Sequence, residues 1–109
     1  MHASLTTSSI KGRVDDANEV AAMAGEAMDS WLSEIDGYGG LLMLVAEESG
    51  SVQAISFWES REVADRHREA RMRLRDRVTE TVSVEVERTE DYEVVFSRFP
   101  APLARDRNS

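Results

Sequence analysis

His67 is the side chain whose surroundings in this sequence most suggest chemistry. It lies on an apolar stripe, four positions after Val63 and three before Ala70. On a helix this spacing turns the imidazole toward the protein interior rather than toward water. A histidine there can act as a general base, donate a hydrogen bond to a ligand oxygen, or bind a haem iron. The structural alternative is a ring bonded to a backbone carbonyl, and the sequence leaves both open.

Four further side chains are candidates for binding a ligand: Trp58, Tyr38, Tyr92 and Thr7. Trp58 ends an apolar run just before the helix that contains His67, where an indole can line a pocket and offer one N–H donor, or fill the core. Tyr38 and Tyr92 can donate hydrogen bonds, although Tyr92 is equally suited to fill a subunit interface. Thr7 belongs to a run of hydroxyl side chains in a strand that we expect at the centre of a sheet, where hydroxyls need partners.

The segment 61–77 contains seven arginines, which at first suggests an RNA-binding surface. Glu62 and Arg66, and likewise Glu69 and Arg73, are four residues apart, and such pairs are typical of a solvent-exposed helix face. The whole chain has a net charge of −8, which repels phosphate backbones and anionic membranes. We therefore expect neither nucleic acid nor a membrane as a partner.

Length and composition exclude several other classes of protein and of site. With 109 residues, 41% of them hydrophobic, the chain fits one globular domain. It has no cysteine, which excludes disulfides and zinc–thiolate sites, and its other histidine, His2, completes no metal cluster. We see no secretory signal at the N-terminus and no apolar run near the ~20 residues of a membrane helix. We expect a cytoplasmic protein without a metal site.

The elements that must position these side chains follow from hydrophobic periodicity. Residues 5–12, rich in threonine and serine, predict a first strand. An apolar stripe over 20–35, with Trp31 as a packing residue, predicts a helix that Gly37 ends. Two apolar runs joined by a turn at 48–51 predict a hairpin. Ser60 then caps a second helix, which we expect to run to about Val78.

Two short runs rich in β-branched residues, 82–86 and 92–99, close the domain on either side of a polar segment. Pro100 and Pro102 stop the second run, so we take residues 1–103 as a single domain and 104–109 as a loose tail. The order strand–helix–strand–strand–helix–strand predicts an α+β fold. This is the ferredoxin-like sandwich (βαββαβ), an antiparallel sheet with two helices on one face.

The central hairpin also predicts a partner. In its first strand Leu41, Met43 and Val45 point to one face, and Leu42, Leu44 and Ala46 to the other. A sheet that is apolar on both faces needs cover on both, and two helices cover only one. We expect the bare face to pack against the same face of a second copy, giving a homodimer.

A succession of motifs resembles a known superfamily. The sharpest are Asp36-Gly37-Tyr38-Gly39-Gly40 before the hairpin and Phe57-Trp58-Glu59-Ser60 after it. They resemble the dimeric α/β-barrel superfamily and, within it, the antibiotic biosynthesis monooxygenase-like proteins, over roughly residues 4–99. The resemblance implies two sheets packed face to face in a dimeric barrel, with a cleft for a small hydrophobic or aromatic molecule.

The resemblance further implies a monooxygenase-like enzyme that oxidises a small aromatic or quinone-type compound without a cofactor. His67 would be its catalytic residue, with Trp58, Tyr38, Tyr92 and Thr7 binding the substrate. Such a site must bind an electron-rich phenolate, take its proton and stabilise the anion. The alternative is a non-catalytic dimer, structural or binding a small hydrophobic ligand, since no paired acid and base is evident. Haem binding is less favoured, because haem-degrading relatives use an asparagine on the first strand and this strand has none.

Overall fold

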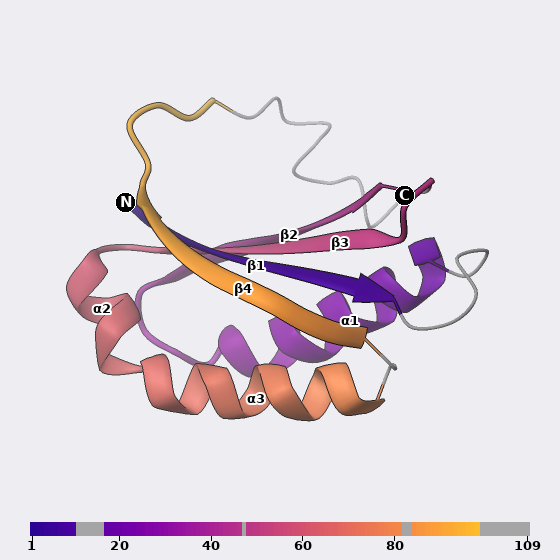
Figure 1. Ribbon diagram of the computed structural model, residues 1–109. Helices are drawn as coiled ribbons and strands as arrows, with labels where there is room; N and C mark the ends of the chain where they lie inside the picture. The colour runs from indigo at the N-terminus through magenta and orange to yellow at the C-terminus, as the bar shows by residue number, and fades with distance from the viewer. Residues whose placement is uncertain (11–16, 47, 82–83, 99–109) are drawn as a thin grey trace.

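The computed structural model describes residues 1–10, 17–46, 48–81 and 84–98 (Figure 1). Its elements in chain order are β1 (His2–Ile10), α1 (Ala17–Leu32), β2 (Tyr38–Ala46), β3 (Ser51–Trp58), α2 (Arg61–Arg66), α3 (Arg68–Thr81) and β4 (Val84–Glu93). The four strands form one antiparallel sheet in the order β2-β3-β1-β4. This arrangement confirms the predicted α+β, ferredoxin-like fold.

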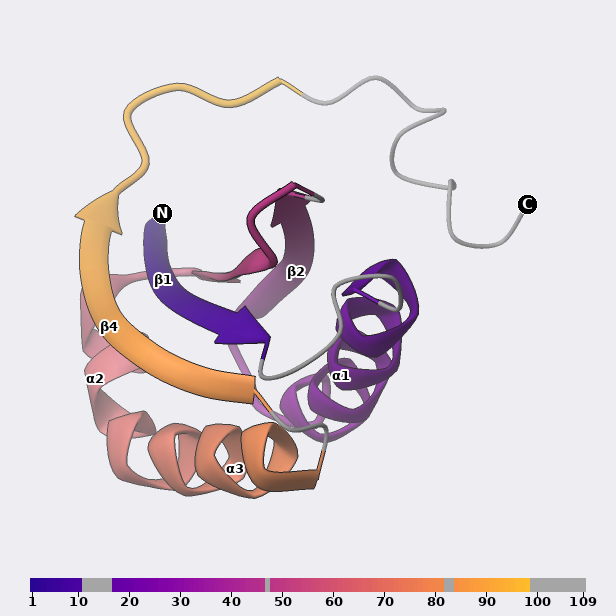
Figure 2. The ribbon, with the colours of Figure 1, turned by 45° about the vertical axis from the view of Figure 1, so that its right-hand side comes forward.

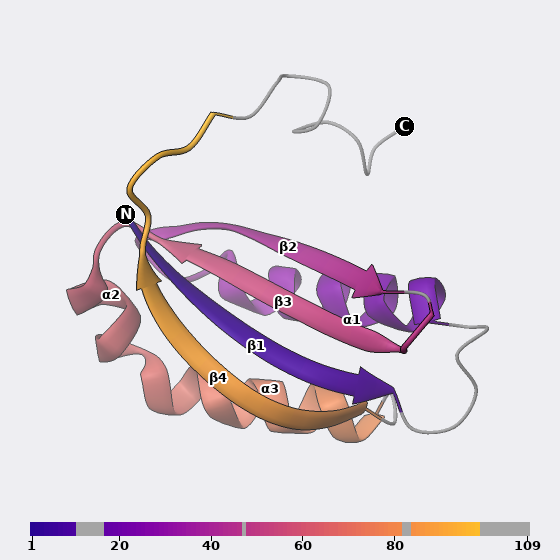
Figure 3. The same ribbon diagram turned by 45° about the horizontal axis from the view of Figure 1, so that its top comes forward.

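The helices lie together on one face of the sheet (Figure 3). α1 packs against β2, and α3 lies beside α1 and against β4 (Figure 2). The best-packed part of the core lies where α1, β3 and α2 meet. Its buried residues are Leu32, Trp58 and Ala64, and Met28, Ile35, Tyr38, Val63 and Leu74 pack against them. No helix of the described chain covers the opposite face (Figure 1).

Strand register confirms the alternation predicted for the hairpin. Leu41 pairs with Ser56 and Met43 with Ala54, and these four side chains face the helices. Leu42 instead pairs with Ile55 on the helix-free face. Both faces of the sheet are therefore apolar in the hairpin, and only one of them has helices over it.

The predicted second helix is wrong in one respect, because it breaks at His67. Ser60 does cap its start, and the Ser60 hydroxyl accepts a hydrogen bond from the Val63 amide at 3.2 Å. The break coincides with a side-chain hydrogen bond: Arg71 donates to the Ala64 carbonyl at 2.7 Å. That carbonyl would otherwise accept the amide four residues on, and a side chain that inserts into a helical ladder kinks it. Two helices, α2 and α3, replace the single one.

The end of the domain also differs from the prediction of two short runs. β4 is one strand, Val84–Glu93, and it passes through the polar segment without interruption. The segment stays in the sheet because its inward side chains find partners on neighbouring elements: Thr89 contacts Thr6, and Asp91 contacts His2. Residues 94–98 lie outside any strand, and the predicted tail, 104–109, lies outside the described residues.

The predicted apolar stripe of α1 is wider than the face that the helix buries. Ala21, Ala24 and Leu32 are buried, but Met23 is 59% exposed and Trp31 is 38% exposed. Trp31 is therefore not the packing residue that we expected. None of the helices in the described ranges is long and apolar enough to span a membrane.

Candidate active site between the sheet and the helices

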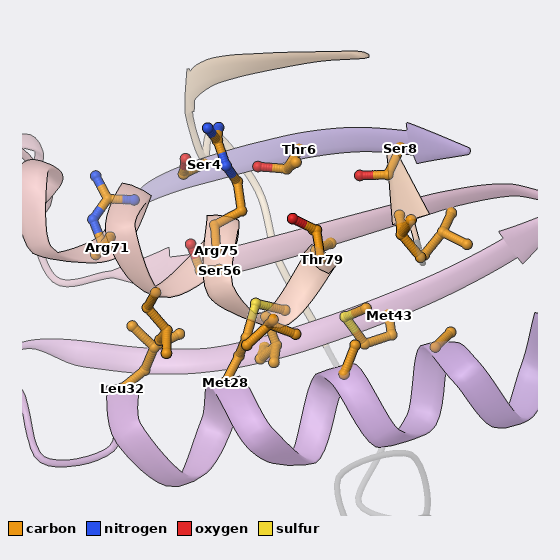
Figure 4. A pocket seen from close by; sticks show the side chains of 18 of the residues that line it. Ser4, Thr6, Ser8, Met28, Leu32, Met43, Ser56, Arg71, Arg75 and Thr79 are labelled. Atoms are coloured by element: carbon orange, nitrogen blue, oxygen red, sulfur yellow. The ribbon is translucent and has the colours of Figure 1, made fainter. Parts of the chain in front are cut away.

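A narrow cleft, with a cavity volume of about 70 Å³ and an opening to solvent, lies between the sheet and helices α1 and α3. Its polar wall comes mainly from β1, whose Ser4, Thr6 and Ser8 point into it in a row (Figure 4). Met28 and Leu32 of α1 and Met43 of β2 form the apolar side. The residues that line the rest are Val20, Ala21, Ala24, Leu41, Val52, Ala54, Ser56, Arg71, Met72, Leu74, Arg75, Val78, Thr79 and Val84. An apolar cleft with a few convergent polar groups is the usual form of a small-molecule site.

Arg71 is the most unusual group in this cleft. Only 5% of the residue is exposed, and one Nη donates to the Ala64 carbonyl. Its guanidinium carbon lies 5.0 Å from the ring centre of Trp58. Its Nε is buried and has no hydrogen-bond partner, and burial lowers the pKa of the guanidinium. No carboxylate of the described residues forms an ion pair with it, so a positive charge faces the cleft without a matching negative one.

Arg75, one helical turn further along α3, also lines the cleft but is bonded on both sides. Its Nη1 donates to Thr89 Oγ1 at 2.8 Å, and its Nε and Nη2 donate to Asp76 Oδ1. Thr89 Oγ1 in turn lies 3.2 Å from Thr6 Oγ1 on the cleft wall. Thr89 therefore links the Arg75 guanidinium to Thr6, one of the hydroxyl side chains on the cleft wall.

A cluster of charged groups lies at the end of the sheet where β1 begins. His2 Nε2 lies 3.1 Å from Asp91 Oδ1, and Arg68 donates to Asp91 at 3.0 Å and to Asp65 at 2.9 Å. Burial alone would raise the pKa of Asp91, but the hydrogen bonds from His2 and Arg68 outweigh it and leave that pKa lowered. Within the described ranges no group of three His, Asp or Glu side chains is placed to hold a metal ion. The cluster therefore pairs its own charges.

Neither a family model nor a curated protein matches this sequence. Solved structures do match. A putative antibiotic biosynthesis monooxygenase from Nitrosomonas europaea covers 88% of this chain and 100% of its own, with a TM-score of 0.61 and 14% identity. ActVA-Orf6, a monooxygenase of Streptomyces coelicolor in complex with the ligand nanaomycin D, covers 92% of both chains, with a TM-score of 0.64 and 14% identity. SnoaB, a cofactor-independent oxygenase from Streptomyces nogalater, covers 93% of this chain and 96% of its own, with a TM-score of 0.59 and 12% identity.

The chain has the fold of the antibiotic biosynthesis monooxygenase proteins. The ferredoxin-like fold of the subunit that the motif resemblance implied is thus confirmed, and the dimeric barrel stays a prediction. At these identities the likeness extends to the fold alone, so activity must be argued from the site.

Two of the residues predicted to bind a ligand lie together behind the cleft. Trp58 is completely buried, and its indole N–H donates to Ser56 Oγ on the cleft wall at 2.9 Å. Tyr38 packs edge-on against Trp58 with ring centres 5.5 Å apart, and its hydroxyl donates to Asp29 at 2.6 Å. Both residues support the wall rather than line it.

The other predicted residues do not come together at the cleft. His67 is half-buried at the break between α2 and α3 and does not line the cleft. Because the helix is interrupted there, the spacing from Val63 no longer fixes which way the ring points. Thr7 and Tyr92 lie on the helix-free face, since β1 residues at even positions face the cleft and Tyr92 pairs with Ala3.

Sequence reasoning missed Arg71, which belongs to a run of arginines that we interpreted as solvent-exposed. A signal was present: Arg71 lies three residues before Leu74 and seven before Val78, on the apolar stripe of the helix. A charged residue on such a stripe is seldom buried unless something pairs with it. The hydroxyls of Ser4 and Ser56 were not singled out either, because alternation alone does not tell which face of a strand borders a cleft.

Proposed function

We propose that this protein is a homodimeric, cofactor-independent monooxygenase-like enzyme that oxidises a small aromatic or quinone-type compound in the cleft. The observation that supports this most is Arg71, a buried guanidinium that forms no ion pair with any described carboxylate. An unpaired buried charge is costly, and a bound phenolate or enolate would supply the missing partner. The likeness to ActVA-Orf6, a monooxygenase, and to SnoaB, a cofactor-independent oxygenase, supports the same reaction class.

The reaction we propose is oxidation of an anthrone-type methylene carbon by dioxygen. The substrate loses a proton to give an enolate, dioxygen adds to the methylene carbon, and the O–O bond then breaks. One oxygen atom stays as a ketone, and the other leaves as water with the two hydrogens of that carbon. The substrate itself supplies the electrons, so the scheme balances without a cofactor.

The cleft favours this step by charge rather than by a base. In the described part of the chain its lining includes no His, Asp or Glu, so we assign no protein base to the proton transfer. Arg71 would instead lower the pKa of the bound substrate, because a nearby cation stabilises the ionised form. The three methionines of the lining, Met28, Met43 and Met72, are flexible enough to adapt to a flat ring system.

The test is the rate at which 1,8-dihydroxyanthrone is converted to its anthraquinone in air, followed by absorbance and corrected for oxidation in buffer. We expect wild type to accelerate the reaction, Arg71→Met to lose most of the acceleration, and His67→Ala to keep it. If wild type leaves the rate of this substrate and of a panel of hydroxynaphthols at the buffer value, the enzymatic proposal is wrong.

A non-catalytic function is the second candidate, and the missing base in the cleft favours it. The same site would then bind an anionic aromatic ligand without turnover. Tight binding of 1,8-dihydroxyanthraquinone together with no oxidation of the anthrone would select this reading. Haem binding gains no support, because no histidine is among the described residues of the cleft lining.

The homodimer part of the proposal rests on the helix-free face of the sheet. That face presents the apolar side chains of Leu5, Leu42, Leu44, Ile55, Phe57 and Tyr92. Leu44 is 46% exposed and Tyr92 is 47% exposed, and a second copy packed on this face would bury both. We expect sedimentation to give a particle of twice the 12.2 kDa chain mass, and Phe57→Glu to give a monomer. A stable wild-type monomer at micromolar concentration would contradict the dimer.

A further inference from the structure

One hydroxyl on the cleft wall, that of Ser56, has an oxygen that already accepts a hydrogen bond, and a second, that of Thr6, lies within hydrogen-bond distance of Thr89. Ser56 Oγ accepts from the indole N–H of Trp58 at 2.9 Å. An indole N–H only donates, so the hydroxyl hydrogen of Ser56 must point elsewhere. Ser56 lines the cleft, and its hydrogen is therefore available to a ligand there.

The hydroxyl hydrogen of Thr6 becomes available to a ligand through a chain of hydrogen bonds that begins at Arg75. Arg75 Nη1 donates to Thr89 Oγ1, and a guanidinium cannot accept in return. The hydrogen of Thr89 is turned away from the cation. Thr6 Oγ1 lies 3.2 Å from Thr89 Oγ1, and either hydroxyl of this pair can be the donor; the relay takes Thr89 as the donor. Thr6, which lines the cleft, is then left with its own hydrogen to donate. Hydrogen bonds in such a chain polarise one another, so the cation strengthens the last donor.

We propose that this wall is a hydrogen-bond donor surface, fixed by Arg75 through Thr89 and by Trp58 through Ser56, that selects ligands with two carbonyl or oxyanion acceptors. The inference rests on the proposed function because it concerns the same cleft. It adds which groups of the wall recognise the two oxygens of the ligand. Thr89 is a positioning residue here, because it acts through Thr6 and does not line the cleft itself.

The strand register sets the spacing of the two donors. Ser4 pairs with Ser56 and Thr6 with Ala54, so Thr6 and Ser56 are diagonal neighbours on one face. Such neighbours lie about 7 Å apart, and each hydroxyl reaches about 3 Å to an acceptor. This geometry suits two acceptor oxygens at opposite sides of a single six-membered ring. Arg71, at the end of the same wall (Figure 4), adds its unpaired Nε.

The test compares 1,4-naphthoquinone with 1,4-dimethylnaphthalene, which has a similar shape and no acceptor. Binding is measured by quenching of tryptophan fluorescence in wild type, Thr89→Val and Thr89→Ser. We expect wild type to prefer the quinone and Thr89→Val to bind it about five to ten times more weakly, which corresponds to one ordinary hydrogen bond. Affinity for the hydrocarbon should not change, and Thr89→Ser, which keeps the hydroxyl, should behave as wild type.

The carbonyl stretch of the bound quinone, from infrared difference spectra, separates a donor role from a merely structural one. We expect a lower frequency in wild type and in Thr89→Ser, and a rise toward the free value in Thr89→Val. Equal quinone affinity and equal frequency in wild type and Thr89→Val would overturn the relay while leaving the proposed function standing. Failure of wild type to bind any quinone or hydroxyanthraquinone would overturn both.

Discussion

Arg68 and Arg71 lie one helical turn apart in α3, and their surroundings are opposite. Arg68 is 41% exposed at its side chain and donates to two carboxylates, Asp65 and Asp91. Arg71 is buried, donates to one backbone carbonyl and leaves its Nε without a partner. The more exposed cation is thus the one that is neutralised. A buried charge normally needs a partner more than an exposed one does, and the difference therefore supports the proposal that Arg71 binds an anionic ligand.

The same contrast separates two regions of the molecule. Around Arg68, charged side chains from β1, α2 and β4 satisfy one another and tie the start of the sheet to the helices. Around Arg71, the rest of the lining is apolar or bears hydroxyls except for Arg75, and no described carboxylate enters it. The charged groups around Arg68 therefore have the composition of a structural ion-pair network, and the cleft around Arg71 has that of a binding site.

Replacing each arginine by methionine should have opposite consequences for ligand binding, and this is the largest effect we expect. Arg71→Met should weaken binding of 1,8-dihydroxyanthraquinone about tenfold to hundredfold, because a hydrogen bond to a charged group contributes about 1.5–3 kcal/mol. Arg68→Met is the matched control and should bind within about twofold of wild type. Titration calorimetry measures both, and equal losses in the two variants would contradict the comparison.

The two substitutions should affect the stability of the fold in the reverse order, with the larger loss for Arg68→Met. Arg68→Met should lower the free energy of unfolding by about 1 kcal/mol, since it breaks two partly exposed ion pairs. Arg71→Met should cost less or raise stability, because methionine fills similar space without a buried unpaired charge. Urea unfolding of both variants without ligand measures this. A larger loss for Arg71→Met would mean that its bond to the Ala64 carbonyl is mainly structural.

Low pH should weaken the ion pairs around Asp91, and the pH range of this effect can be predicted. The pKa of Asp91 lies below its ordinary value of 3.8, so its ion pairs stabilise the fold above that value and lose this contribution as pH falls through the lower, folded one. We expect Asp91→Asn to cost somewhat under 1 kcal/mol near neutral pH, after allowance for solvent screening. The difference from wild type should shrink as the pH falls below about 4. Glu87→Gln, an exposed carboxylate on the same strand, is the control and should show no such change.

The fold was predictable from sequence because its signals are local. The apolar hairpin and its turn lie within about twenty residues, and the resulting topology is confirmed. The break at His67 was not predictable, since it depends on where the Arg71 side chain turns. The continuity of β4 was not predictable either, because the partners of Thr89 and Asp91 lie on β1, more than 80 residues earlier.

The candidate site was predicted less well for a related reason. Trp58 and Tyr38 were chosen for their residue types and do support the cleft wall. His67 was chosen from helical spacing, which does not extend across a break. Arg71 was overlooked because six other arginines surround it in the sequence, and only packing distinguishes the buried one.

The smallest effect concerns the width of the cleft rather than its charge. Gly25 of α1 is buried, and a Cβ there would lie 2.7 Å from Cγ of Met43, which lines the cleft. Gly25→Ala should gain up to about 1 kcal/mol in helix propensity and lose a similar amount as Met43 shifts, so stability should stay within about 0.5 kcal/mol of wild type. Because Met43 lines the cleft, a thioether displaced into it would narrow the cleft, and we expect about threefold weaker binding of 1,8-dihydroxyanthraquinone. The double variant Gly25→Ala/Met43→Ala removes the obstructing side chain and should recover the affinity. If Gly25→Ala binds as wild type does, the ligand does not reach the Met43 side of the cleft, and the site must be confined to the wall between Thr6 and Arg71.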